Sequence, residues 1–254
     1  MSSELFVGEA AFDALAAEWD ALVARGMTDT PFQTLAYQRA WWTHLHPAGA
    51  TLLTVAARDE AGALFAIGCF FALDGVLRFN GCVEETDYLD LIAPADRAEA
   101  AWAEVLACLE AADTPGWTSL DLRNLPDASP SRAILPALAR ARGYEFGEEQ
   151  AEVCPTIPLP DTFDAYLENL DSKQRREVSR KLRRAEAADL TTTVVGPDED
   201  VAAAVERFLD LLQKSTFEKR DWLNDGRRAL FHEVARAAQT VGTLQLLFLS
   251  LIHI

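Results

Sequence analysis

The sequence predicts an α/β (α+β) protein of two domains, and three observations support this prediction. Half of the 254 residues are hydrophobic and a quarter are charged, as expected for a chain with buried cores. Each half of the chain shows helical periodicity followed by strand-like runs. Residues 154–160 (CPTIPLP) contain three prolines, which predict an extended connector. We therefore place a connector at residues 155–160, between an N-terminal domain at 1–154 and a second domain at 161–254.

The first half is expected to open with helices and to continue as an antiparallel meander. Apolar side chains at helical spacing, including Phe12, Leu15 and Trp19, predict the first helix, and Asp74-Gly75 predicts a tight hairpin turn. The expected elements are helices at 9–24 and 33–45, strands at 51–58, 63–73 and 76–80, a helix at 94–112, a strand at 117–123, a helix at 131–142 and a strand starting at 144–146.

Two adjacent tryptophans, Trp41 and Trp42, lie in the second helix. Neighbouring positions on a helix point in different directions, so the two rings cannot both point inward. One ring then belongs to the core and the other lines a groove or an interdomain contact. Ordinary packing of both rings is the alternative, and it is favoured because aromatic side chains chiefly pack.

The second half follows a similar plan of helices and strands, which is compatible with tandem copies of one fold. The expected elements are a short helix at 162–170, a basic helix from 171, a strand at 191–195, a helix at 200–214, a polar loop at 215–226, a helix at 227–242 and a strand at 243–254.

The basic helix concentrates positive charge in an acidic protein. The chain has a net charge of −17, residues 171–184 (DSKQRREVSRKLRR) carry +5, and the remainder therefore carries −22. Good helix formers and an N-cap at Asp171 or Ser172 predict the helix. Its narrow apolar stripe consists of Val178, Leu182 and Ala185, and the opposite arc gathers five cations: Lys173, Arg176, Arg180, Arg183 and Arg184.

This cationic arc is the strongest functional signal in the sequence. Arg175 lies beside the apolar stripe, so its guanidinium is expected to be the most shielded. The candidate residues for binding a substrate or a phosphate are Lys173, Arg175, Arg176 and Arg180. The bound group would be a phosphate, a carboxylate or a nucleic-acid backbone. The alternative is a solvated helix face whose arginines pair with nearby acids.

A second charged feature is the polar loop at residues 80–90 (NGCVEETDYLD). It contains four acids: Glu84, Glu85, Asp87 and Asp90. Such a loop could bind a cation or a substrate amine, but it lacks the DxDxDG order of a calcium loop, so a plain acidic loop is expected. The loop acids that could act as a base are Asp87, Asp90, Glu218 and Asp221. Each is expected to be structural, so we assign no catalytic residue.

Several protein classes are disfavoured by what the sequence lacks. No basic segment followed by an apolar run opens the chain, and no stretch of about 18 apolar residues occurs, so neither a signal peptide nor a transmembrane segment is expected. The cysteines lack CxxC spacing and are expected to be reduced and mostly buried, as in a cytoplasmic protein: Cys69, Cys82, Cys108 and Cys154. The pI of about 4.6 argues against DNA as a partner. The His44-Leu-His46 and His232-Glu233 pairs lack further ligands, so no metal is expected.

Three segments resemble one known family. Residues 31–45 (PFQTLAYQRAWWTHL) resemble its N-terminal segment pF-x-x-p-x-W…WW. Residues 154–187 resemble its signature cP-x-i-x-LP-x-s-w-x-x-yl-x-x-L-s-x-k-x-R-r-x-x-r-r-k-x-r-r-l, and residues 209–249 resemble the helix–loop–helix–strand that follows. The family comprises GNAT-type acyltransferases of the BioF2-like or CelD-like (cellulose-biosynthesis) group, relatives of the FemAB peptidoglycan-bridge transferases.

The resemblance implies two GNAT-like domains with mixed sheets. It also implies transfer of an acyl group from acyl-CoA, such as acetyl-CoA, to an amine in polysaccharide or cell-envelope biosynthesis. Two alternatives stay open: a FemAB-like transferase that uses aminoacyl-tRNA and a cell-wall precursor, and a non-enzymatic scaffold that docks on an anionic surface. Salt dependence separates the scaffold from the enzymes, because non-specific anion binding falls steeply with ionic strength, whereas saturable CoA binding should fall less.

Two departures from the family pattern affect these expectations. GNAT domains hold the CoA pyrophosphate on backbone N–H groups at an R/Q-x-x-G-x-G/A loop, and this chain has no good copy of that pattern. The second domain is also shorter than in the family and is expected to be truncated. Residues 249–254 (LSLIHI) can be encoded by a sequencing-library adaptor, so we expect them to be adaptor-derived.

Overall fold

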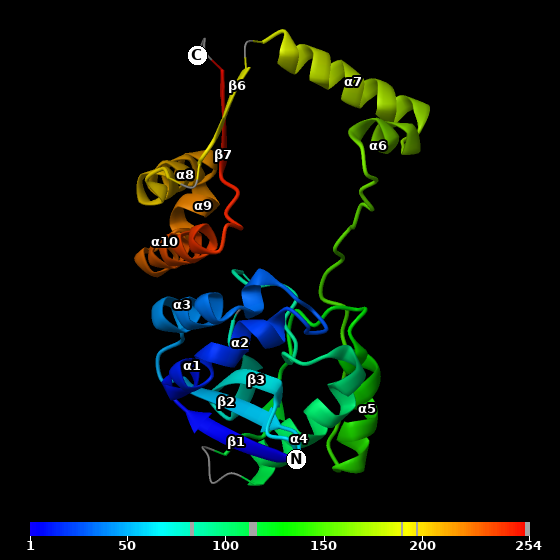
Figure 1. The fold of residues 1–254 in the computed structure, drawn as a ribbon, viewed down its shortest axis with the longest axis vertical. Helices are drawn as coiled ribbons and strands as arrows, with labels where there is room; N and C mark the ends of the chain where they lie inside the picture. The colour runs from blue at the N-terminus through cyan, green and yellow to red at the C-terminus, as the bar shows by residue number, and fades with distance from the viewer. Residues whose placement is uncertain (82–83, 112–115, 189, 197, 252–254) are drawn as a thin grey trace.

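The computed structural model describes residues 1–81, 84–111, 116–188, 190–196 and 198–251 (Figure 1). Its α/β fold has one mixed five-stranded sheet with helices on both faces, followed by an arm of two helices and by a smaller body with a two-stranded sheet. The predicted α/β class is therefore confirmed. None of the helices described is long and apolar enough to cross a membrane.

The five-stranded sheet forms the centre of the first half. Its strands are β1 (Ser2–Val7), β2 (Thr51–Arg58), β3 (Leu64–Leu73), β4 (Val76–Phe79) and β5 (Ser119–Leu120), in that spatial order. The first four strands are antiparallel neighbours, whereas β5 runs parallel to β4. Asp74 and Gly75 both have positive φ, at 52° and 76°, which gives the predicted tight turn between β3 and β4.

Helices cover both faces of this sheet. The helices of this half are α1 (Ala10–Ala14), α2 (Ala16–Val23), α3 (Leu35–Leu45), α4 (Ala98–Ala111) and α5 (Pro130–Ala141), with short 3₁₀ turns η1 (Pro31–Gln33) and η2 (Ala95–Arg97). Successive residues of β2 face opposite cores: Leu52 packs with α1, α2 and α3, and Leu53 packs with α4. A strand buried on both faces reads as a continuous apolar run, which explains the sequence of β2 and β3.

Several sequence predictions for this half need correction. The first helix breaks at Leu15 into α1 and α2, and β1 was not expected at all. The predicted strand at 117–123 is reduced to two residues in β5. No strand forms at 144–146; Tyr144 instead packs against Trp117 and donates a hydrogen bond from its hydroxyl group to Glu110.

The expectation that Trp41 and Trp42 cannot both point inward is wrong. Trp41 is 1% exposed and stacks on Phe71 of the sheet, whereas Trp42 is 6% exposed and stacks on His46. Both rings are buried because α3 lies between the sheet and α10 (Asp225–Thr240), whose Leu230 joins the same buried cluster. The favoured alternative, ordinary packing of both rings, is confirmed.

The second half contains the arm and the smaller body. Its elements are α6 (Phe163–Asn169), α7 (Ser172–Glu186), β6 (Leu190–Val194), α8 (Val201–Ser215), α9 (Phe217–Trp222), α10 and β7 (Leu247–Leu251). β6 and β7 pair antiparallel, and α8, α9 and α10 pack together over a small core that includes Leu209 and Phe248. Helix α9 occupies the segment that was expected to be a polar loop.

A close backbone approach joins this smaller body to the first half. A Cβ at Gly226, in the first turn of α10, would lie 2.6 Å from the main-chain oxygen of His44, so only glycine permits this contact. His44 also pairs with Glu233 across the same contact, with 2.7 Å between Nε2 and Oε2. Helices α3 and α10 therefore pack directly on each other.

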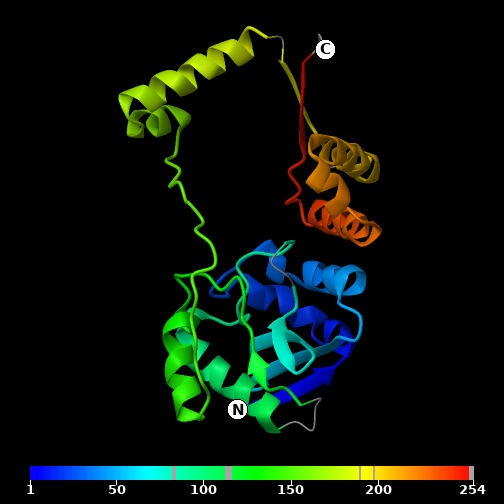
Figure 2. The same ribbon diagram turned by 180° about the vertical axis from the view of Figure 1, so that it is seen from behind.

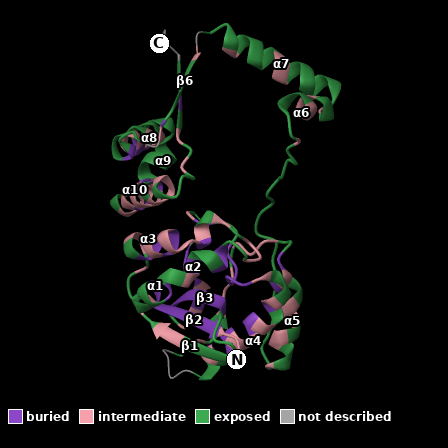
Figure 3. Ribbon diagram, viewed as in Figure 1, coloured by how far each residue is buried: buried purple, intermediate pink, exposed green. Residues whose placement is uncertain are grey.

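The arm, residues 161–188, stands apart from both bodies (Figures 1 and 2). It is joined to the first half by residues 147–160, which have no regular secondary structure and expose Val153, Ile157 and Leu159 by 71%, 65% and 81%. Neither α6 nor α7 contains a buried residue (Figure 3). Both faces of the arm are thus open to solvent in the described structure.

The cysteines are less buried than expected. Cys69 is buried, Cys108 is half-buried and Cys154 is exposed, and all three are free thiols. Burial raises the pKa of the Cys69 thiol to about 12, so this sulfur is no nucleophile. The fourth, Cys82, lies outside the described residues.

Candidate anion-binding site

Helix α7 carries the candidate site, and the side chain of its N-cap residue binds main-chain N–H groups of its first turn. Asp171 is the N-cap, as predicted, and its Oδ1 accepts hydrogen bonds from the main-chain N–H groups of Lys173 and Gln174 at 2.8 Å. These N–H groups are therefore not available to a ligand. An anion bound by α7 would therefore be held mainly by its side chains.

Arg175 differs from the other candidates because its guanidinium is engaged by the main chain. It donates to the carbonyl oxygens of Leu167 and Glu168 at 2.7 Å and of Leu170 at 3.2 Å. These carbonyls lie at the C-terminal end of α6, where no intrahelical donors remain. The side chain is exposed rather than shielded, and it fixes the corner between α6 and α7.

The remaining candidates lie on the open side of α7. Arg176 donates from Nε to the carbonyl of Ser172, one turn back, at 3.0 Å. Arg180 pairs with Glu177 at 2.7 Å, and this hydrogen bond lowers the pKa of the Glu177 carboxyl. Lys181 reaches the same carboxylate at 3.7 Å, so two cations share one acid.

Three further cations of α7 have no such partner. Within the described residues, no carboxylate lies within ion-pair distance of Lys173, Arg183 or Arg184. The face is exposed, as the solvated-face interpretation expects, but among the described arginines of α7 only Arg180 pairs with an acid. Lys173 and Arg184 are eleven residues apart on the arc, a length of roughly 16 Å at the helical rise. The arc is an elongated, largely uncompensated cationic face.

The acidic loop is already occupied by a cation from the protein itself. Arg227 of α10 forms ion pairs with Glu84 and Glu85, lies 4.6 Å from the ring centre of Trp222 and donates to its carbonyl at 2.7 Å. The Glu85 side chain is 4% exposed and that of Arg227 is 17% exposed. The cation that the sequence suggested for this loop is therefore an internal guanidinium, while Asp87 remains exposed.

Asp90 is the buried acid of the same loop, and its contacts are structural. Its carboxylate accepts hydrogen bonds from the hydroxyl groups of Ser129 and Ser131 and from the main-chain N–H of Leu91. Ser131 in turn accepts a bond from Trp102 Nε1 at 2.6 Å. This chain of contacts ties the loop to the start of α5 and to α4.

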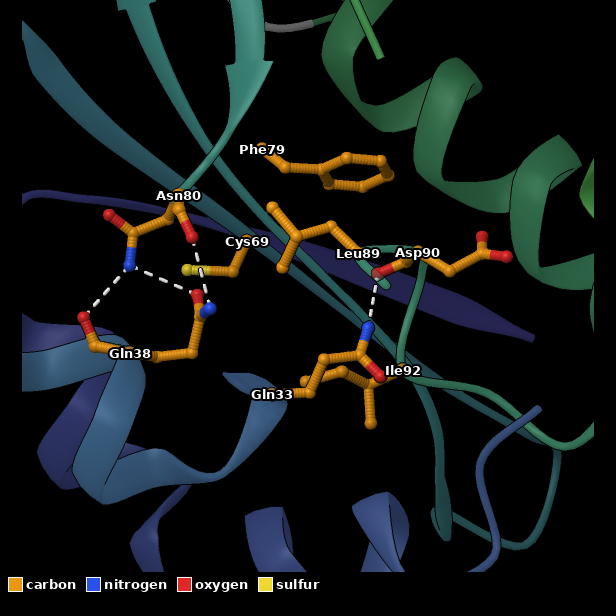
Figure 4. A pocket seen from close by; sticks show the side chains of 8 residues that line it. All are labelled: Gln33, Gln38, Cys69, Phe79, Asn80, Leu89, Asp90 and Ile92. Atoms are coloured by element: carbon orange, nitrogen blue, oxygen red, sulfur yellow. Dashed lines mark hydrogen bonds between the residues drawn. The ribbon is translucent and has the colours of Figure 1, made fainter. Parts of the chain in front are cut away.

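A small cavity lined by both polar and apolar residues lies beside Asp90 (Figure 4). Gln33 donates to the main-chain oxygen of Asp90, and the side chains of Gln38 and Asn80 exchange hydrogen bonds with each other's main chain. The cavity measures about 10 Å³, which is room for a single water molecule. It is far too small for a substrate.

The titration of Asp90 gives a first testable prediction. Burial raises the pKa of Asp90 above its ordinary value of 3.8, and the two serine hydrogen bonds oppose this shift. Because the folded pKa exceeds the unfolded one, the stabilising contribution is complete below 3.8 and is lost as pH rises through the folded pKa. Asp90→Asn removes this titration. The free energy of unfolding of the wild type, relative to this variant, should therefore increase as pH falls from neutrality.

Urea unfolding of the wild type and of Asp90→Asn at several pH values below neutrality measures the difference between their free energies of unfolding. Asp87→Asn, in the exposed part of the same loop, is the matched control and should follow the wild-type profile. A wild-type-minus-Asp90→Asn difference that does not change with pH would contradict the assignment.

The histidines and remaining acids have structural partners. His232 pairs with Glu206 at 2.5 Å, and Arg228 pairs with the same carboxylate. Glu218 lies in α9, and Asp221 is exposed near Arg220 at 3.9 Å. Among the residues that the structure describes, no group of three or more His, Cys, Asp or Glu side chains is placed to hold a metal ion.

Comparison of the chain with protein-family models, with curated proteins and with solved structures gives no match in any of the three.

Proposed function

We propose that the chain is part of an N-acyltransferase that transfers an acyl group from acyl-CoA to an amine in polysaccharide or cell-envelope biosynthesis. In this proposal α7 holds an anionic group of the donor or the acceptor. The observation that carries it is the cationic arc of α7, on which Lys173, Arg183 and Arg184 have no carboxylate partner among the described residues.

The fold is compatible with this proposal. The first half has the mixed sheet that the acyltransferase resemblance implies, since β5 is parallel to β4 while the other neighbours are antiparallel. The second half opens with helices and continues into a strand, in keeping with a second domain of related plan.

Because the chain lacks a good copy of the glycine-rich loop that holds the CoA pyrophosphate, the arginines of α7 are the candidate phosphate ligands. Acyl-CoA carries several phosphate charges, which backbone N–H groups can hold at a glycine-rich loop. This chain has no good copy of that loop, so the phosphates need other donors. Arginine guanidinium groups bind phosphate through paired, charge-assisted hydrogen bonds. Arg176 and Arg180, one turn apart on α7, supply two such groups.

Calorimetric titration of acetyl-CoA tests this proposal. We expect saturable binding by the wild type and a loss of affinity of about tenfold or more in Arg176→Ala/Arg180→Ala, at roughly 1.4 kcal/mol or more for two charge-assisted contacts. The matched control is Arg123→Ala/Arg220→Ala, which removes the same charge from exposed sites outside α7. Its affinity should equal that of the wild type.

Circular dichroism of each variant first establishes that α7 is retained, which alanine substitution favours. An equal loss in both double variants would show that only net charge matters and would contradict a site on α7. Absence of binding by the folded wild type would reject acyl-CoA as the ligand of this chain.

A further inference from the structure

We propose that the arm docks the protein on an anionic phospholipid bilayer through the cationic arc of α7. This inference concerns an interaction surface and does not depend on acyl-CoA being the donor. The arc consists of Lys173, Arg176, Arg180, Arg183 and Arg184.

The position of the arm favours a surface over a small ligand. Helix α7 stands apart from both bodies (Figures 1 and 2), and all five residues of its cationic arc are exposed. A small anion is normally held by groups that converge from several sides of a concave site. An extended anionic surface needs only one straight, unobstructed face. The arc, roughly 16 Å long, provides such a face.

The charge distribution also sets an orientation. Residues 171–184 carry +5 and the rest of the chain −22. An anionic bilayer therefore attracts α7 and repels both bodies. The extended residues 147–160 allow α7 to lie on the surface while the bodies remain at a distance.

Docking of this kind is electrostatic and does not require insertion. The apolar stripe of α7, which includes Val178 and Leu182, lies opposite the cationic arc, so it faces away from a surface that the arc contacts. Binding should then fall steeply with salt, because exposed charges are screened within a Debye length. An amphipathic helix that inserted its apolar face would retain binding at high salt.

A nucleic acid is the other extended polyanion, and the residues of α7 favour it less. No aromatic side chain occurs in Ser172–Glu186, so α7 offers no ring for base stacking. The cationic arc carries no amide side chain either, since Gln174 lies outside it, and base edges are commonly read by such groups. The features of the arc match an array of phosphate charges alone.

Vesicle flotation tests the proposal directly. The full chain is mixed with vesicles of phosphatidylcholine alone or with about 30% phosphatidylserine, at about 0.05 M and about 0.5 M salt. We expect binding to the phosphatidylserine vesicles at low salt, at least tenfold weaker binding at high salt, and none to phosphatidylcholine.

Arg183→Ala/Arg184→Ala removes two cations from the C-terminal half of the arc, and circular dichroism first establishes that α7 is retained in this variant. It should lose about tenfold in affinity for the phosphatidylserine vesicles. The matched control, Arg123→Ala/Arg220→Ala, should bind vesicles as the wild type does.

Three results would overturn the proposal. They are binding that is equal for the two vesicle types, wild-type vesicle affinity in Arg183→Ala/Arg184→Ala, and retention of a DNA duplex by a folded protein that ignores phosphatidylserine vesicles. The last result would identify a nucleic acid as the partner of the arc instead.

Discussion

Replacement of Trp102 by alanine is expected to lower the free energy of unfolding by about 3–5 kcal/mol. Trp102 is fully buried in α4, where it packs with Phe79 of the sheet. The substitution leaves a large cavity and also removes the hydrogen bond that Trp102 Nε1 donates to Ser131. Because Ser131 also donates to the Asp90 carboxylate, the loss disturbs the contacts between α4, α5 and the acidic loop. Equilibrium unfolding in urea measures the change.

Two further variants separate the effect of the cavity from the effect of the lost hydrogen bond. Trp102→Phe keeps most of the ring volume and lacks the N–H donor, so its free energy of unfolding should fall by less than that of the alanine variant. Trp117→Ala, a half-buried tryptophan in the same half, is the control for removal of an indole outside the core. An alanine variant at 102 that loses less than about 1 kcal/mol would show that α4 does not pack as described.

The second large effect is expected at Arg227, where Arg227→Ala should lower the free energy of unfolding by about 2–3 kcal/mol. The guanidinium pairs with Glu84 and Glu85, and the Glu85 side chain is only 4% exposed. Removal of the cation leaves a buried carboxylate without its opposite charge, which costs more than the loss of an exposed ion pair. Urea unfolding at neutral pH measures this change as well.

The two acids provide an internal control for Arg227. Glu84 is 58% exposed, so Glu84→Gln should cost less than about 1 kcal/mol. Arg227→Ala/Glu85→Gln should recover part of the loss, since the uncompensated buried charge is then gone. A double variant that is no more stable than Arg227→Ala would show that the penalty does not come from the stranded carboxylate.

Local sequence patterns predicted the regular elements of the first half well, except where tertiary contacts decide. β2 was predicted with its observed bounds and β3 to within one residue, because strands buried on both faces are continuous apolar runs. β1 was missed because this edge strand is mostly exposed and gives little alternation. The burial of Trp42 depends on α10, which lies nearly two hundred residues further along the chain.

In the candidate site, too, local sequence predicts some features and tertiary contacts determine the others. The charge of α7 and its cap at Asp171 follow from the local sequence. The roles of two arginines do not. Arg175 binds carbonyls of α6, which requires the corner between the helices, and Arg227 meets an acid that precedes it by 142 residues. Composition indicates that a cation is present, whereas only the fold shows which carboxylate or carbonyl it reaches.

The pairing of β6 with β7 has a consequence for the order of events during synthesis. Leu190–Val194 leaves the ribosome well before Leu247–Leu251, and α8, α9 and α10 are made in between. An isolated strand cannot pair its main-chain hydrogen-bonding groups with a neighbouring strand. β6 therefore stays unpaired until these helices and β7 have been synthesised. The nascent chain therefore carries an unpaired, uncharged strand next to a strongly cationic helix, and during this interval it is most exposed to aggregation and to capture by chaperones.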